Sequence, residues 1–355
     1  MKRDESLDDL RPKDPTDLSE QHLAYKAGPL AAAFQGRIPT GKELRNISEE
    51  LGVDMATTIL LKTLQDSVVH GEFARRVRRT NLDDIKNAYR DHLKQVEVVI
   101  VASNLYQSGR RWGDHVELWG RWAREMGFTT EVVATDPKVS VSSNARFIVQ
   151  FLEANPHPRR IMVTYGQGTS ELRLVMQRRF ADKPSEIPDW AKGIRGWINV
   201  CGSFHGAMSS DLLLKSKRKR ILTSLKMRLA GRNPIVLKET SPSFPFWKPA
   251  MPKPEEMSIT SIVAVPQRWE VPGDMREMHH QLGRKYPNDG AVSFYEATAH
   301  PGHLMFVPGM SHRAESIPLE PVLKRAIALT AVGIFKTDYK AEIERKTRGA
   351  LDVES

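Results

Sequence analysis

The feature that most constrains this chain of 355 residues is a tight glycine turn between a strand and a helix. The apolar run at residues 159–163 follows two prolines and predicts a short buried strand. The turn contains Gly166 and Gly168, and glycine reaches positive φ without steric cost. Good helix formers at 171–176 then predict a helix. A strand, a sharp turn and a helix together form the repeating unit of a parallel sheet covered by helices.

The same alternation of strands and helices extends over residues 96–335. Further strands are predicted at 96–102, 129–134, 193–200, 258–265 and 302–307, and helices at 112–126, 142–154, 274–285 and 317–335. Strands of this apolar kind are buried on both faces, as in a sheet with helices on either side. The sequence therefore predicts an α/β fold with a doubly wound, mostly parallel sheet.

Residues 1–95 are predicted to form a helical extension. Thr40 and Glu43 have the spacing of a capping box before a helix that Gly52 ends. The predicted apolar stripes of three helices are Leu44, Ile47 and Leu51, then Ile59, Leu60, Leu64 and Val68, then Leu82, Ile85, Tyr89 and Leu93. Amphipathic helices usually pack on a core, so this extension covers either the main domain or a partner. At the other end, residues 336–355 are predicted to be a charged, frayed tail.

Composition limits the compartment and the cofactors. The chain is 40% hydrophobic and 27% charged, which is typical of a globular protein with a sizeable core. Its single cysteine, Cys201, excludes an intrachain disulfide and a cysteine metal cluster, and neither a metal nor a cofactor is predicted. The first residues lack the apolar segment of a signal peptide, and the apolar runs are too short to cross a membrane. We therefore expect a cytoplasmic protein that can associate peripherally with membranes.

The net charge of +10 favours anionic partners. An anionic membrane surface and an acidic protein both fit this charge. Nucleic acid is an unlikely partner, because the sequence has neither an aromatic and basic RNA-binding motif nor zinc-finger spacing. Composition carries no information on the oligomeric state.

Three segments together resemble a known family. They are residues 142–145, which open a helix, residues 165–168 in the glycine turn, and residues 200–206 after the next strand. They resemble the α/β-hydrolase-fold esterases and lipases over residues 96–335, and those proteins commonly have Gly-Tyr-Ser-Gln-Gly at the nucleophile elbow. In this alignment Thr164 replaces the first glycine and Gly166 replaces the serine, while Gly168 is the last glycine. The resemblance implies a turn that is preserved and a nucleophile that is lost.

The family order of nucleophile, acid and histidine implies two further site residues. Asp289 lies in an Asn-Asp-Gly loop where the family has its acid, and His312 follows the strand at 302–307 where the family has its histidine. In a working enzyme the histidine takes the serine proton and the aspartate orients the imidazole. Asp289 is alternatively an ordinary turn residue. His300 and His303 lie at the start of the strand and fit the role less well.

The resemblance also implies an oxyanion hole made by backbone N–H groups. One donor is Gln167, the residue after the nucleophile position, and the other lies near Ser103 and Asn104. That second loop lacks the glycines usual in active family members. Together with Thr164 and Gly166, it is the third departure around a single site.

Other residues near the turn also carry nucleophilic side chains. Ser170 and Thr169 are predicted to cap the helix after the turn. Cys201 and Ser203 follow the next strand on the correct edge of the sheet, with His205 nearby, but a lone buried cysteine is usually a small apolar residue.

Residues 208–256 are predicted to be a helical lid. Its basic cluster consists of Lys215, Lys217, Arg218, Lys219 and Arg220, and its apolar stripe of Leu214, Ile221, Leu222, Leu225 and Leu229. This pattern is typical of a solvated lid face, but also of a helix that lies on an anionic membrane or binds a partner, and less so of a nuclear-localisation or nucleic-acid patch. The arm at 242–249 either roofs a pocket for an apolar ligand or packs on the core.

Two classes of function remain open from the sequence. In the first, the chain is a degenerate hydrolase-fold pseudoenzyme that binds an acyl or other apolar ligand, or a protein partner, without turnover. In the second, it is an active ester or lipid hydrolase that uses a non-standard nucleophile, or a water activated by Asp289 and His312.

Overall fold

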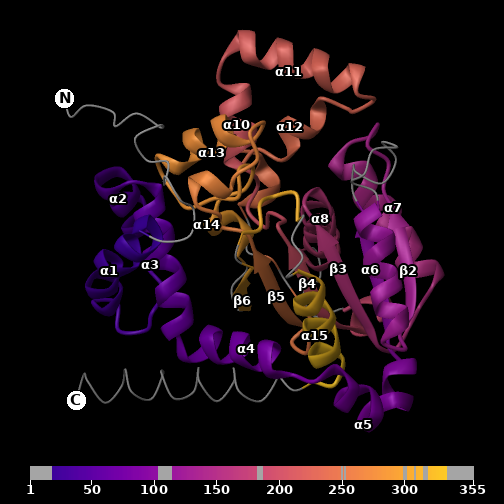
Figure 1. Ribbon diagram of the computed structural model, residues 1–355. Helices are drawn as coiled ribbons and strands as arrows, with labels where there is room; N and C mark the ends of the chain where they lie inside the picture. Colours follow the sequence, from indigo (N-terminus) through magenta and orange to yellow (C-terminus); the bar gives the residue numbers. More distant parts are fainter. Residues whose placement is uncertain are drawn as a thin grey trace, which may run out of the picture.

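A six-stranded parallel sheet forms the centre of the computed structural model (Figure 1). The structure describes residues 18–102, 114–181, 187–248, 251, 253–298, 302–307, 309–314 and 319–333. The strands are β1 (Glu97–Ala102), β2 (Thr129–Ala134), β3 (Arg160–Tyr165), β4 (Ile194–Val200), β5 (Ser258–Val263) and β6 (His303–Phe306). Their order is β2-β1-β3-β4-β5-β6, and every neighbouring pair is parallel. The predicted α/β class is confirmed.

Helices cover both faces of the sheet, so the predicted double winding is also confirmed. The helices on one face include α6 (Asp114–Glu125) and α15 (Leu319–Ala331), and those on the other include α7 (Val141–Ala154) and α8 (Gln167–Ala181). Successive side chains of β3 alternate between the two cores: Ile161 and Val163 belong to the first, and Met162 to the second. This is why every residue of β3 is buried and its centre is apolar.

The N-terminal helices begin beside the β6 edge of the sheet, and the last of them packs against α15 (Figure 1). They are α1 (Leu18–Ala32), α2 (Gly41–Leu51), α3 (Val53–Asp66), α4 (Val68–Arg79) and α5 (Leu82–Lys94). The predicted capping box of Thr40 and Glu43 is present at the start of α2. Leu44 and Leu60 share a hydrophobic cluster with Val263 of β5. Of the two interpretations of this extension, the structure therefore supports a cover for the main domain.

Some predicted stripe residues are exposed instead. Leu51 is the last residue of α2, where the chain turns at Gly52, and Val68 begins α4 rather than continuing the preceding helix. Tyr89 lies at a kink in α5, which rotates it away from the core. Helices α1 and α4 were not predicted as separate elements. In each case a helix boundary or kink overrides the regular spacing.

The helix after the glycine turn begins earlier than predicted, at Gln167 rather than near residue 171. Gly166 has φ +52°, which turns the chain sharply. Gly168 then brings the first turn of α8 against β1, since a Cβ atom at residue 168 would lie 2.8 Å from the carbonyl oxygen of Val101. A larger residue at position 168 would push the helix away from the sheet.

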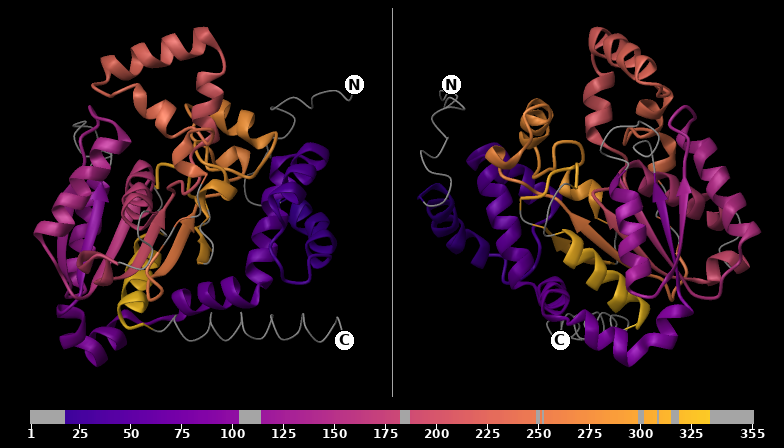
Figure 2. Two further views of the ribbon diagram at one scale, coloured as in Figure 1. Left: turned by 180° about the vertical axis from the view of Figure 1, so that it is seen from behind. Right: turned by 45° about the vertical axis from the view of Figure 1, so that its right-hand side comes forward.

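The segment predicted to be a lid contains three helices, α10 (Met208–Leu214), α11 (Lys217–Leu229) and α12 (Ile235–Glu239). The predicted single stripe from Leu214 to Leu229 is wrong, because the helix breaks at residues 215–216 and Ser216 caps α11. Figures 1 and 2 show α11 at the far end of the lid from the sheet. The remaining short elements are α9 (Asp189–Lys192), η1 (Pro245–Trp247), η2 (Arg268–Glu270), α13 (Arg276–Gly283) and α14 (Phe294–Ala297). Among the residues described, no helix has both the length and the apolarity to cross a bilayer.

Candidate active site

The glycine turn lies at the carboxyl end of β3, directly before α8. The N–H of Gly166 donates to the carbonyl oxygen of Val200 (3.2 Å), and its own carbonyl accepts the N–H of Thr169 (3.2 Å). A Cβ atom at residue 166 would lie 3.9 Å from Nε2 of His312. The backbone of this turn is therefore held from both sides, and it faces an imidazole.

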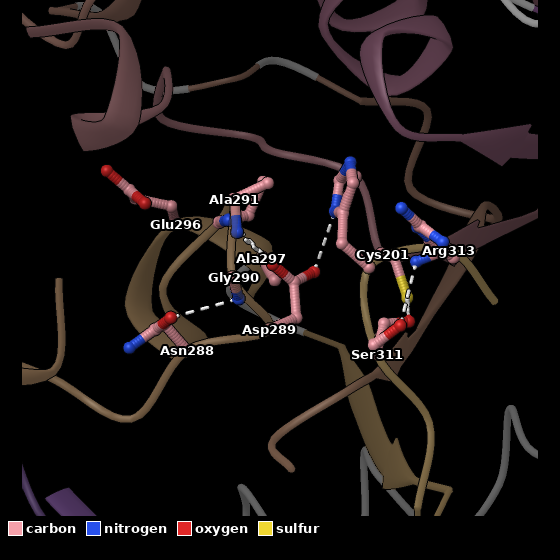
Figure 3. A network of polar contacts seen from close by, with 12 residues as sticks. Cys201, Asn288, Asp289, Gly290, Ala291, Glu296, Ala297, Ser311 and Arg313 are labelled. Carbon is pink, nitrogen blue, oxygen red and sulfur yellow. Dashed lines mark hydrogen bonds and ion pairs between the residues drawn. The ribbon is translucent and has the colours of Figure 1, made fainter. Parts of the chain in front are cut away.

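Asp289 and His312 form a hydrogen-bonded pair. Nδ1 of His312 lies 2.8 Å from Oδ2 of Asp289, and the N–H of His312 donates to the Asp289 carbonyl at 3.0 Å. The carboxylate is nearly buried, at 2% exposure for the residue, and its Oδ1 accepts the N–H groups of Ala291 (2.8 Å) and Val292 (2.7 Å). Figure 3 shows Asp289 within this loop. The aspartate orients the ring so that Nε2 faces Gly166.

The imidazole of His312 is largely buried beside Asp289, but part of its surface is open to solvent. Burial alone lowers the pKa of His312, but the charge of Asp289 and the hydrogen bond to it outweigh this effect and raise the pKa. The side chain keeps 24% of its surface exposed, which leaves room for contact with a ligand. Such a pair can accept a proton from a hydroxyl or a water placed beside Nε2.

Comparison with solved structures identifies the fold. A metagenomic carboxyl esterase superposes with a TM-score of 0.51 at 18% identity, over 68% of this chain and 75% of the esterase. The chain has the α/β-hydrolase fold. No protein-family model matches the sequence, and no curated protein matches it.

Two lipolytic proteins of known structure resemble the chain less closely. A mature lipase of Bacillus licheniformis has 12% identity and a TM-score of 0.42, over 68% of this chain and 92% of the lipase. A phospholipase of Legionella pneumophila has 14% identity and a TM-score of 0.41, over 70% of this chain and 61% of the phospholipase.

Thr164, which departs from the glycine common at this point of the hydrolase fold, is accommodated by hydrogen bonds. Its buried hydroxyl accepts Nε1–H of Trp197 (2.8 Å) and lies 2.8 Å from the hydroxyl of Thr169. Thr169 in turn donates to Oδ1 of Asn199 (2.7 Å). The prediction that Thr169 and Ser170 cap the helix is wrong: both lie inside α8, and Ser170 donates to the carbonyl of Ser203 (3.1 Å).

Cys201 is not arranged as a nucleophile. Its thiol is buried and faces the carbonyl of Ser311 at 3.9 Å. Burial first, and then the charge of Asp289, raise its pKa well above the ordinary value, which opposes thiolate formation. His205 instead faces the carbonyl of Thr298 (3.1 Å). The structure therefore does not bring this cysteine and histidine together as a pair.

Of the other predicted site residues, His303 and Gln167 are described by the structure, and three are not. His303 is buried in β6 and stacks on Phe73, with ring centroids 4.6 Å apart. Gln167 begins α8, where the first backbone N–H groups of a helix have no partner within it. Ser103, Asn104 and His300 lie outside the described residues. Within the described ranges, no group of three His, Cys, Asp or Glu side chains is placed to hold a metal ion.

Tyr165 supports the imidazole in a way that was not predicted. Its hydroxyl donates to the carbonyl of His312 at 2.6 Å, and the two rings stack with centroids 6.1 Å apart. The only signal in the sequence is an aromatic residue directly before the turn.

Glu171 is a second feature that was missed. This carboxyl group is fully buried one turn into α8, and its Oε1 accepts amide N–H groups of Asn144 and Gln167, both at 2.8 Å. Burial raises its pKa to about 7, against the opposing effect of these hydrogen bonds. Its only signal in the sequence is an acidic residue directly before the apolar residues Leu172, Leu174 and Val175.

The titration of Glu171 predicts a pH dependence of stability. The pKa of Glu171 in the folded state lies above its ordinary value. The protonated carboxyl group therefore contributes fully to the free energy of unfolding below pH 4.5, and this contribution is lost as the pH rises towards 7. In urea unfolding from pH 5 to 8, Glu171→Gln should remove a slope of up to about 1.4 kcal/mol per pH unit. Glu296, whose pKa burial also raises to about 7, leaves a residual slope.

Glu50→Gln is the matched control for this measurement, because Glu50 is exposed on α2. It should leave the pH profile unchanged. Equal slopes in wild type and Glu171→Gln would contradict the assignment.

A pocket of about 850 Å³ opens between residues 208–245 of the predicted lid and Lys285. Its apolar lining includes Met208, Leu212, Leu214, Phe244 and Pro245, and its polar lining includes Asp211, Lys215, Lys238, Ser241, Ser243 and Lys285. Within the arm, Phe244 lines this pocket, whereas Trp247 is buried on the core beneath the guanidinium of Arg173 at 5.0 Å. Whether an apolar ligand occupies the pocket remains a prediction.

Proposed function

We propose that this chain is a hydrolase-fold protein with Gly166 at the nucleophile position, which binds an acyl or other apolar ligand without serine hydrolysis. One observation carries the proposal: Nε2 of His312 faces Gly166, which has no side chain. A Cβ atom added at Gly166 would lie 3.9 Å from this nitrogen. The hydroxyls of Thr169 and Ser170 are hydrogen-bonded elsewhere, and Cys201 is buried with a raised pKa. These three groups are thus poor substitutes for a serine.

The lid pocket supports the binding part of the proposal. Its volume lies within the range of small-molecule sites, and five of its lining residues are apolar. The lysines at 215, 238 and 285 add positive charge to the lining. A ligand with an apolar chain and a carboxylate, such as a fatty acid, matches both properties.

Wild type should resist covalent labelling by a fluorophosphonate probe and should bind a fluorescent fatty-acid analogue. Phe244→Glu places a carboxylate in the pocket, so its dissociation constant should rise about tenfold or more in a fluorescence titration. Phe147→Glu makes the same change at an exposed site on α7 and should bind like wild type.

Labelling of wild type that disappears in Cys201→Ala or Ser170→Ala would contradict the loss of the nucleophile. Equal binding by Phe244→Glu and Phe147→Glu would contradict the lid pocket as the ligand site.

The intact Asp289 and His312 pair favours a second candidate function, hydrolysis by an activated water. The imidazole accepts a proton at Nε2 and the carboxylate stabilises the resulting cation. Ester turnover by wild type that is lost in His312→Gln, without probe labelling, would favour this function over simple binding.

A further inference from the structure

Helix α11 exposes a continuous apolar stripe. All residues of α11 are described, and none of them is buried. Ile221 (67% exposed), Leu225 (54%) and Leu229 (81%) follow one another at intervals of four, and Leu222 (54%) lies beside them. Residues four apart stack on one helix face, so these four side chains form a single surface. Exposed apolar side chains gathered in this way mark an interaction site.

The stripe points away from the protein. On the opposite face of α11, Thr223 and Met227 are partly buried, and Met227 packs against the core between the sheet and α7. Figure 2 shows α11 at the outer end of the lid in two further views. The helix is therefore held by one face while it presents the other.

Cations lie along both sides of the stripe. At 100° per residue, Lys217 and Arg228 flank it on one side, and Lys219 and Lys226 on the other. All four are exposed, and the helix contains no acidic residue. Two more cations, Arg218 and Arg220, complete a run at its N-terminus.

The placement of these cations disfavours the isolated helix. Positive charge near a helix N-terminus opposes the helix dipole and costs free energy. The run at residues 217–220 is therefore not explained by helix stability. An anionic surface beside it would offset this cost.

From these features we infer that α11 docks the protein on an anionic lipid bilayer. The apolar stripe enters the boundary between headgroups and acyl chains, while the flanking lysines and arginines contact lipid phosphates. A second copy of the chain fits less well, because two such faces would bring like charges together. Nucleic acid also fits less well, because its charged backbone would not bury the aliphatic side chains of the stripe. The inference is independent of the acyl ligand proposed above.

Sedimentation with vesicles tests the inference. The full chain should bind vesicles of phosphatidylglycerol and phosphatidylcholine in equal parts, and bind phosphatidylcholine alone much more weakly. The double variant Leu225→Glu and Leu229→Glu should weaken binding about tenfold or more. A second double variant combines Lys219→Gln with Lys226→Gln. Each of these two substitutions should lower the affinity for the anionic vesicles about fivefold.

The control carries the same change of charge elsewhere. Tyr25→Glu with Leu30→Glu alters two exposed apolar residues of α1 and should bind nearly as wild type does. Circular dichroism should show that each variant is folded. Equal loss in both glutamate variants, or no binding by wild type, would overturn the inference. Dimerisation in lipid-free buffer that Leu225→Glu and Leu229→Glu abolish would also overturn it, in favour of a second copy.

Discussion

Gly166→Ser is expected to show esterase activity that wild type lacks. A hydroxyl on the new Cβ is one bond nearer to His312 Nε2 than the present 3.9 Å, within the hydrogen-bond reach of about 2.6–3.2 Å. The rate of p-nitrophenyl butyrate hydrolysis should exceed the background rate measured with wild type on the order of 100-fold or more, a modest share of the roughly 10⁶-fold contribution of a full triad. The φ of +52° strains any side chain here, at a cost of about 1–3 kcal/mol.

Gly166→Ala is the control, because it carries the same backbone strain without a hydroxyl. It should unfold at the same urea concentration as Gly166→Ser but remain inactive. The added activity should disappear in Gly166→Ser with His312→Gln. A folded, inactive Gly166→Ser would contradict the roles proposed for Asp289 and His312.

Arg160→Met is expected to destabilise the protein by about 3–5 kcal/mol, measured by urea unfolding. Arg160 at the start of β3 is fully buried, and it pairs with Glu97, its partner residue on β1. It also donates to the carbonyl of Asn155 at 2.5 Å. Removing the guanidinium leaves a nearly buried carboxylate without its counterion. Both residues lie at the end of the sheet away from the glycine turn, so ligand binding should be unaffected.

The double variant Arg160→Met with Glu97→Leu tests this explanation. Because it removes both charges, it should recover most of the stability lost in Arg160→Met alone. An equal loss in the single and double variants would show that the packing of the arginine stem, rather than the charge, is responsible.

The strands and the major helices of the sheet could be predicted because their signals are local. Thr129–Ala134 is a strand with the predicted bounds, and the helix expected at 142–154 begins one residue earlier. An apolar run between turn residues has few alternatives to a buried strand. The predictions failed at boundaries such as Val68, where neighbouring helices compete for the same residues.

Some residues of the candidate site could be predicted from the sequence, and others could not. The resemblance to α/β-hydrolase-fold proteins implied Asp289 and His312 as site residues, and the structure brings them into contact at 2.8 Å. Their catalytic roles, and the assignment of Gly166 to the nucleophile position, remain predictions. Tyr165 and Glu171 could not be predicted, because each acts through a partner distant in sequence, the carbonyl of His312 and the amide of Asn144.

The sequence by itself determined that this chain forms a parallel α/β sheet with a tight turn that has no side chain at its centre. These properties depend on residues adjacent along the chain. Only the tertiary structure decided that His312 faces that turn and that the stripe of α11 points outward. Both depend on how separate elements pack together, because burial and hydrogen bonding between distant segments determine which face of each element is left exposed.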